Sequence, residues 1–291
     1  MDMKELVIIS GKGGTGKTSL TASFAALAKN AVLADCDVDA ADLHLLLHPI
    51  VRHQELFRSG RTAVIDADVC IQCGKCRELC RFDAIDETFT VNSFACEGCA
   101  VCAHFCPVNA IAMQENVCGE WYVSDTHYGP MVHARLGIAE ENSGKLVSLV
   151  RQQAQRLAKE QQKSLILIDG PPGIGCPVIS SISGANMVLA VTEPTVSGLH
   201  DLQRVAELTA HFNIPTGVCV NKATINPEIT CEIQRYCATD NLRFLGEIPF
   251  DRVLVDALLH QQPVVEYSHG DTVLAIRRIW ERMLQWSIEH E

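Results

Sequence analysis

The sequence predicts an α/β protein in which a doubly wound, mostly parallel sheet is interrupted by a small α+β insert. Two observations predict this class. Short apolar runs alternate with helical stretches at both ends of the 291-residue chain, which is the pattern of βαβ units. Between about residues 60 and 120 the alternation stops and cysteines crowd together. We therefore expect one domain made of residues 1–60 and 117–291, with residues 61–116 inserted as a separate module.

The first βαβ unit is expected over residues 5–35. ELVIIS (5–10) is a short apolar run of the kind found in strands buried on both faces. The next stretch, 17–30, is rich in alanine and carries Leu20, Phe24 and Leu27 at helical spacing. AVLAD (31–35) then reads as the second strand.

After the insert the same alternation resumes. Strands are expected over 164–169, 187–195, 215–222 and 242–249, and helices over 144–161, 196–212, 227–240, 251–261 and 271–290. The last helix carries an apolar face, which has two interpretations: the helix packs in the core, or it lies on a membrane surface. Its acidic end and the net charge of −11 favour the core helix.

Composition limits the function classes. A net charge of −11 argues against sequence-independent binding of nucleic acid and against adsorption to an anionic membrane. No export signal and no apolar run long enough to span a bilayer is seen, so we expect a cytoplasmic protein without stable membrane insertion. In a reducing compartment, clustered cysteines indicate metal binding rather than disulfides.

GKGGTGKTS (11–19) lies between the first strand and the first helix and has the spacing of a phosphate-binding loop. Gly11, Gly13, Gly14 and Gly16 let successive backbone N–H groups, Thr15 included, face one point. Lys17 is expected to reach the β- and γ-phosphates, and the Thr18 hydroxyl to hold Mg²⁺, with Ser19 following. We expect ATP binding and Mg²⁺-dependent hydrolysis.

Lys12 is a second lysine in this loop. With it, the loop resembles the deviant phosphate loop of the MinD/ParA-type ATPases, which include the nitrogenase iron protein and the cytosolic iron–sulfur scaffold ATPases. In that group the early lysine crosses a dimer interface to the partner's nucleotide. The resemblance implies that Lys12 acts catalytically in trans, in a homodimer or in a heterodimer with a related ATPase subunit.

Further stretches resemble the switches and base-binding segments of the same family. LADCDVDAADLH (33–44) resembles the first switch, with Asp37 as the catalytic and Mg²⁺-site carboxylate ahead of Asp35 or Asp39. LILIDGPPGIG (165–175) resembles the second, with Asp169 at the Mg²⁺ and a hinge at Gly170 and Gly173. The resemblance also implies nucleotide contacts from residues that follow two later strands: Asn221, Lys222, Pro249, Phe250 and Asp251.

The insert contains a repeat. CIQCGKCRELC begins at Cys70 and CEGCAVCAHFC at Cys96, and both read C-x-x-C-x-x-C-x-x-x-C. This doubled spacing is the signature of two-cluster ferredoxins, in which the fourth cysteine of each run binds the other cluster. By that rule the sets are Cys70, Cys73, Cys76 and Cys106 for one [4Fe-4S] cluster, and Cys80, Cys96, Cys99 and Cys102 for the other. Zinc is the alternative metal for these cysteines, but the doubled run disfavours it.

Taken together, the chain resembles MinD-superfamily P-loop ATPases with an inserted two-cluster ferredoxin domain. The resemblance extends to residues 128–147, 170–185 and 191–202. Because the insert begins downstream of Asp37 in the first switch, our leading hypothesis is an ATP-driven dimer switch coupled to the ferredoxin module, with gated electron transfer to a redox partner. The alternatives are a scaffold or carrier that delivers clusters to apo-proteins, and a MinD-like positioning or regulatory ATPase. The roles of Cys176, His133 and Arg135 stay open, and Cys36, Cys118, Cys219, Cys231 and Cys237 are expected to be small buried hydrophobes.

Overall fold

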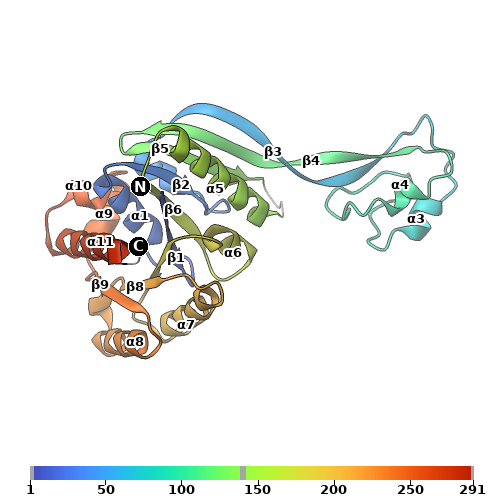
Figure 1. The fold of residues 1–291 in the computed structure, drawn as a ribbon. Coiled ribbons are helices and arrows are strands. Elements are labelled where there is room, and N and C mark those ends of the chain that lie inside the picture. The colour runs from blue at the N-terminus through green and yellow to red at the C-terminus, as the bar shows by residue number, and fades with distance from the viewer. Residues whose placement is uncertain (1–2, 138–141, 290–291) are drawn as a thin grey trace. The chain divides into compact units, whose positions relative to one another are not determined.

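The computed structural model describes residues 3–137 and 142–289, so residues 138–141 of the 128–147 stretch lie outside the described part. The chain divides into two compact units. The larger contains the described residues up to Glu55, residues 120–137, and the chain from Asn142 onward. The smaller is Leu56–Gly119. Figure 1 shows how the elements of each unit are arranged.

The described strands form one sheet in the order β3-β4-β5-β2-β6-β1-β7-β8-β9. The pairs β1–β6, β1–β7, β2–β5, β2–β6, β7–β8 and β8–β9 are parallel. The strands of the larger unit are β1 (Lys4–Ser10), β2 (Ala31–Asp35), β5 (Gly129–Leu136), β6 (Leu165–Pro172), β7 (Met187–Thr192), β8 (Thr216–Val220) and β9 (Arg243–Glu247). The mostly parallel α/β fold expected from the apolar runs is confirmed.

Helices cover both faces of this sheet. Leu6 and Ile8 of β1 join one core cluster with Phe24 and Trp280, while alternate residues of a strand face the opposite side. There, α5 and α6 pack against each other and against β2 and β6. The helices of this unit are α1 (Lys17–Leu27), α2 (Leu43–Leu47), α5 (Ser143–Glu160), α6 (Cys176–Ile182), α7 (Val196–His211), α8 (Pro227–Thr239), α9 (Val253–Leu259), α10 (Val264–Tyr267) and α11 (Asp271–Glu289), with a 3₁₀ turn at Ala223–Ile225.

The apolar face of α11 is part of the core. Ile276, Ile279 and Met283 are buried, and the Trp280 ring lies 5.1 Å from the ring of Phe24 in α1. The expectation that this helix packs in the core, rather than on a membrane surface, is therefore confirmed. None of the helices in the described residues is both long and apolar enough to cross a bilayer.

The smaller unit is reached through β3 (Ile50–Ile65) and β4 (Ile111–Thr126), two strands that the sequence pattern did not predict. The expected boundaries at residues 60 and 117 lie inside these strands. Beyond them, the unit holds two one-turn helices, α3 (Lys75–Leu79) and α4 (Val101–His104), and an antiparallel bridge between Ile85 and Val91. Both helices begin within a cysteine run.

Candidate functional site

The predicted site residues lie in or after the carboxyl-terminal parts of five strands of the sheet, β1, β2, β6, β8 and β9. The glycine-rich loop connects β1 to α1. Gly14 and Gly16 have φ angles of 79° and 87°, a region that residues with a Cβ disfavour. A Cβ on Gly16 would also lie 2.4 Å from the Asn221 amide nitrogen. The loop thus has the tight curvature of a phosphate cradle and opens onto the N-terminus of α1.

Lys17 lies between two switch carboxylates. Its ammonium is 3.2 Å from Asp37 Oδ2 and 3.2 Å from Asp169 Oδ1. Burial lowers the pKa of Lys17, but the charges of Asp169, Asp37 and Asp35 outweigh burial and raise it overall. The lysine that is expected to bind phosphate is therefore a cation, paired in this structure with both carboxylates.

Asp35 and Asp37 have different surroundings. Asp35 is fully buried, and its carboxylate accepts the backbone N–H groups of Asp37 and Leu43 at 3.1 and 3.3 Å. Burial, followed by the nearby charge of Asp169, raises the pKa of Asp35 well above its ordinary value. Burial also raises the pKa of Asp37. Asp35 shapes the loop from within, Asp37 points to Lys17, and Asp39 is exposed.

Hydroxyl groups complete this cluster. Thr18 Oγ1 donates to Asp169 Oδ2 at 2.7 Å, and Thr21 Oγ1 donates to Asp169 Oδ1 at 2.9 Å. Carboxylate and hydroxyl oxygens are suitable ligands for Mg²⁺. Thr15 Oγ1 is buried in the loop and has no hydrogen-bond partner within residues 3–137 and 142–289. Such an orphaned polar atom fits a site whose partner is a ligand oxygen.

Asn221 supports the loop. Its side-chain amide donates to the Thr15 carbonyl oxygen at 2.7 Å, and Lys222 Nζ donates to the Gly14 carbonyl oxygen at 3.3 Å. Gly170, expected in a hinge, lies within β6, where a Cβ would be 2.6 Å from Ile9 Cγ2. The absence of a Cβ at Gly170 allows this close packing, and the hinge expected there stays a prediction.

Gly173 lies beyond β6 with φ 92°, and its N–H donates to the Ser10 carbonyl oxygen at 2.8 Å. The segment that follows β9 includes Pro249 and the exposed Phe250. Asp251 accepts the Val253 N–H and the Thr272 hydroxyl there, so its carboxylate links the start of α9 to the start of α11.

Glu193, which sequence reasoning did not single out, binds both remaining lysines of the site. Lys12 Nζ lies 3.3 Å from Glu193 Oε2, and Lys222 forms a short ion pair with Glu193 Oε1. Burial opposes ionisation, yet the hydrogen bond and charge of Lys222, together with those of Lys12, lower the pKa of Glu193. Its place directly after β7 is the signal that could have identified it, because ligand-facing residues follow the strands of parallel sheets.

The eight predicted cysteine ligands line two separate cavities in the smaller unit. One is lined by Cys70, Cys73, Cys76 and Cys106, and the other by Cys80, Cys96, Cys99 and Cys102. Each cavity draws three cysteines from one run and one from the other. Burial raises the pKa of the Cys76 and Cys102 thiols, so thiolates at those positions call for a nearby cation.

Within residues 3–137 and 142–289, no group of three or more His, Cys, Asp or Glu side chains converges on one metal ion. A four-iron cluster makes a different demand, because its cysteines bind different irons and surround a volume rather than a point. The apolar residues that share the two cavities, such as Ile71, Pro107, Phe82 and Met113, would shield such a cluster from water. The four-cysteine cavities therefore fit the group implied by the sequence.

The remaining cysteines divide by burial. Cys36, Cys118, Cys219 and Cys237 are buried, as expected. Cys231 is exposed on α8, so its assignment as a buried hydrophobe is wrong, because its position in the helix faces solvent. Cys176 is exposed at the start of α6.

His133 and Arg135 lie on β5. His133 Nε2 is 2.9 Å from Ser124 Oγ, and its ring stacks on Tyr122 with centroids 4.9 Å apart. Burial, with a smaller effect of His44, lowers the pKa of His133 to about 4.

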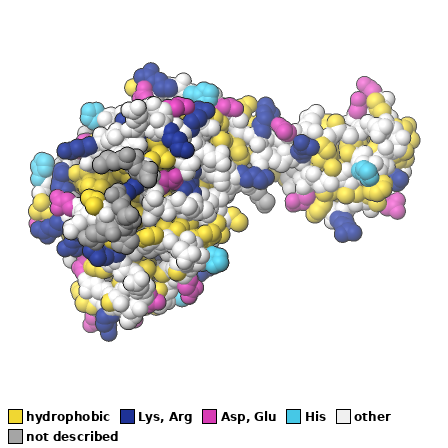
Figure 2. Space-filling model, viewed as in Figure 1, with side chains coloured by type: hydrophobic (Ala, Val, Ile, Leu, Met, Phe, Trp, Pro, Cys, Tyr) yellow, Lys and Arg dark blue, Asp and Glu magenta, His cyan; other side chains and the backbone are white. Residues whose placement is uncertain are grey.

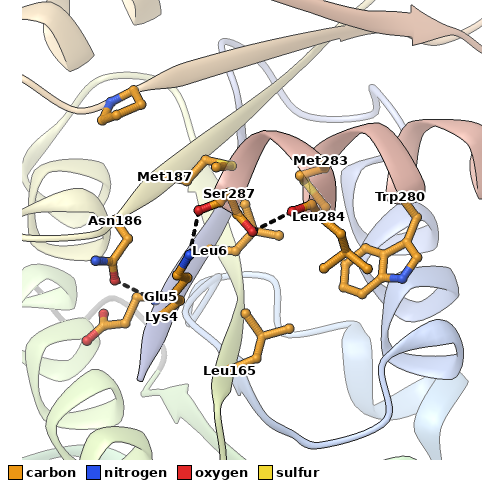
Figure 3. A pocket seen from close by; sticks show the side chains of 11 residues that line it. Lys4, Glu5, Leu6, Leu165, Asn186, Met187, Trp280, Met283, Leu284 and Ser287 are labelled. Carbon is orange, nitrogen blue, oxygen red and sulfur yellow. Dashed lines mark hydrogen bonds between the residues drawn. The ribbon is translucent and has the colours of Figure 1, made fainter. Parts of the chain in front are cut away.

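A further cavity, of about 180 Å³, lies at the amino ends of β1 and β6, beside α11 (Figure 3). Leu6, Met187, Met283 and Trp280 form its apolar wall, and the Lys4 ammonium donates to the Ser287 carbonyl oxygen there. None of the predicted site residues lines it. The cavity is separate from the strand ends that carry the glycine-rich loop.

The fold and the glycine-rich loop define a P-loop nucleotide-binding protein. More closely, the chain belongs to the CobQ/CobB/MinD/ParA nucleotide-binding domain family, whose profile matches residues 6–264. It is a nucleotide-binding ATPase of the MinD/ParA type.

The chain is also similar to several relatives and to solved structures. An uncharacterized protein of Methanocaldococcus jannaschii is 36% identical over 227 residues, which cover 76% of this chain and 79% of the relative. The pyruvate synthase subunit PorD of Methanothermobacter marburgensis is 40% identical over 50 residues, 17% of this chain and 62% of that subunit. The septum site-determining protein MinD of Pyrococcus horikoshii, complexed with Mg-ADP, shares the fold with a TM-score of 0.59 and 18% identity, over 99% of both chains.

Proposed function

We propose that this ATPase is an iron–sulfur protein in which a nucleotide-driven dimer switch controls electron transfer from a two-cluster ferredoxin-like insert to a redox partner. The observation that carries the proposal is the division of eight cysteines between two cavities, each with three cysteines of one run and the fourth of the other. Two sequence runs that exchange their last ligand are the mark of paired [4Fe-4S] clusters.

At the nucleotide site, the backbone N–H groups of the loop and the N-terminus of α1 bind the phosphates. Lys17 leaves its carboxylate partners to bind the β- and γ-phosphates, and Thr15 Oγ1 gains the partner that it lacks. Mg²⁺, when bound, neutralises charge on the phosphate oxygens. Thr18 and Asp169 hold it, and Asp37, released from Lys17, orients the attacking water.

In the insert, four cysteines in each cavity hold one cluster, which supplies one-electron chemistry when bound. Ile71, Phe94 and Phe105 of this unit are 61%, 82% and 48% exposed. Hydrophobic side chains gather over the unit that carries α3 and α4 in Figure 2. An exposed apolar surface beside the cysteine runs suits a small, transient interface with a redox partner.

The link between the two chemistries follows the chain. β3 leaves the ATPase unit soon after the first switch, β4 returns from the insert, and β5 follows directly. β5 is parallel to β2, with His133 in register with Asp35. The Leu136 N–H donates to the Val38 carbonyl oxygen at 3.2 Å. Movement of the first switch therefore acts on the strand that follows the insert.

Paired cysteine variants test the cluster assignment. Cys106→Ser should remove one cluster, about half of the iron of anaerobically purified protein. Cys70→Ser/Cys106→Ser, within one cavity, should lose no more than the single variant. Cys80→Ser/Cys106→Ser, across the cavities, should lose both clusters. Iron content and electron paramagnetic resonance after reduction measure this, and equal losses in the two double variants would show that the sets are wrong.

Coupling is tested separately on the intact protein. We expect the midpoint potential of at least one cluster to differ between the ADP state and the state with a non-hydrolysable ATP analogue. The rate of ATP hydrolysis should also depend on whether the clusters are reduced. Potentials and rates that stay unchanged in both comparisons, with the clusters present, would rule out the gating.

A cluster carrier is the second candidate, and one observation favours it: Cys73 and Cys99 are exposed, one in each cavity. Exposed ligands can exchange with those of an acceptor more readily than buried ones. Transfer of iron and sulfide to an apo-ferredoxin, faster with ATP than with ADP, would support the carrier. Retention of both clusters through many ATP turnovers would support electron transfer.

A further inference from the structure

Glu193 occupies a central position at the mouth of the glycine-rich loop. Its carboxylate pairs with Lys12 through one oxygen and with Lys222 through the other. Lys222 in turn donates to the Gly14 carbonyl oxygen, so it stays on the loop. Among the residues that the structure describes, the Lys12 ammonium has no such backbone anchor, and its other contact is a 3.4 Å hydrogen bond to the Ser197 hydroxyl. Glu193 is therefore the charged group that holds Lys12 to its own subunit.

The surroundings keep this contact in place without burying it. The Lys12 and Glu193 side chains retain 34% and 14% of their exposure. Ser197 lies in the first turn of α7, whose N-cap residue Thr195 accepts the Gly198 N–H at 2.9 Å. A Cβ on Gly11 would lie 2.4 Å from Asp201 Cβ, so α7 packs tightly beside the loop. The pair is thus largely buried at the Glu193 end and accessible to a competitor at the Lys12 end.

We propose that Glu193 is a positioning residue that latches Lys12 in cis, and that a second copy of this chain must break the latch before Lys12 can reach the nucleotide bound to that copy. The inference rests on the proposed dimer. Nucleotide phosphates in the second copy compete with Glu193 for one ammonium group, so the latch raises the concentration at which nucleotide-bound chains pair. It also keeps Lys12 away from its own nucleotide.

The test is the dissociation constant of the dimer of full-length, cluster-loaded protein with a non-hydrolysable ATP analogue, measured by sedimentation velocity. A partly exposed ion pair is weak, so Glu193→Gln should lower this constant by about 2- to 5-fold. The effect should shrink as salt is raised from about 0.05 to 0.5 M, since screening weakens the latch in the wild-type protein. The effect of Glu193→Gln on fold stability, measured by thermal unfolding, should not follow the salt dependence of its effect on the dissociation constant.

Three variants separate the causes. Glu207→Gln removes the same charge from an exposed position on α7 and should leave the constant unchanged. Lys222→Met removes the other lysine, and Glu193→Gln should still tighten the dimer in that background. Lys12→Gln should abolish analogue-dependent pairing.

The two proposals can fail separately. If the wild type pairs in a Lys12-dependent way but Glu193→Gln pairs equally or more weakly, the latch is refuted and the dimer stands. If Glu193→Gln tightens the dimer only when Lys222 is present, the latch on Lys12 is also refuted. If neither wild type nor Glu193→Gln pairs at any concentration tested, the dimer and the latch are both wrong.

Discussion

Replacing Gly16 by alanine tests the geometry of the glycine-rich loop in the absence of nucleotide. Gly16 has φ 87°, where a Cβ costs about 1–2 kcal/mol. The new Cβ would also lie 2.4 Å from Asn221 Nδ2. The amide must then leave the Thr15 carbonyl oxygen, and the loss of this buried hydrogen bond costs about 1–3 kcal/mol. We expect Gly16→Ala to lower the free energy of unfolding by about 2–5 kcal/mol.

The assay is urea-induced unfolding of the nucleotide-free protein under anaerobic conditions. Gly13→Ala is the matched control: Gly13 is not among the residues with positive φ, and its added Cβ would meet no atom within 4 Å. It should unfold within about 0.5 kcal/mol of the wild type. In an Asn221→Ala background the clash is gone, so Gly16→Ala should cost only the backbone part, about 1–2 kcal/mol. An equal cost in both backgrounds would refute the role assigned to Asn221.

Three further predictions concern single side chains. Glu5→Gln leaves buried Arg151 without its ion pair and should lower the free energy of unfolding by about 3–5 kcal/mol. Asp125→Asn, which breaks an exposed ion pair, is the control and should lower it by at most about 1 kcal/mol. Thr15→Val should stabilise the nucleotide-free protein by about 1 kcal/mol, because it removes an unpaired buried hydroxyl, yet weaken nucleotide binding in calorimetry. The pKa of His133 is lowered to about 4 in the folded protein. As pH falls below about 6.5, the unfolded chain therefore takes up a proton at this residue before the folded chain does, which destabilises the fold. The melting temperature of the wild type should consequently fall more between pH 7 and 5 than that of His133→Asn.

The buried sheet could be predicted from the sequence, and the strands that lead to the insert could not. β1 and β2 are buried along nearly their whole length, so their apolar runs are continuous and conspicuous. β3 is exposed at most of its positions. A strand that faces water on both sides has no hydrophobic period to detect, which explains why 16 residues of β3 were missed.

The candidate site shows the same division between local and long-range information. The spacing of residues 11–19 and the position of Asp169 after an apolar strand are local signals, and they indicated the loop and the second switch. The partner of Asn221 is not local: its amide binds Thr15, 206 positions away. A short motif placed Asn221 near the nucleotide, but its contact with the loop required the folded chain.

The path of the chain offers a coupling mechanism that depends on strands rather than on a surface between the two units. Asp35 of β2 carries a buried carboxylate, and His133 of β5 is its neighbour in register. The His133 imidazole binds the Ser124 hydroxyl on β4, the strand that returns from the insert. Val38 in the first switch is tied to Leu136 at the end of β5. Three adjacent strands are thus connected by side-chain and backbone hydrogen bonds. In the proposed function, rearrangement of the switch around a γ-phosphate would shift β5 and, through it, the base of β4. Packed elements respond to such shifts in steps rather than by gradual bending, which is what the proposed gate on electron transfer would require.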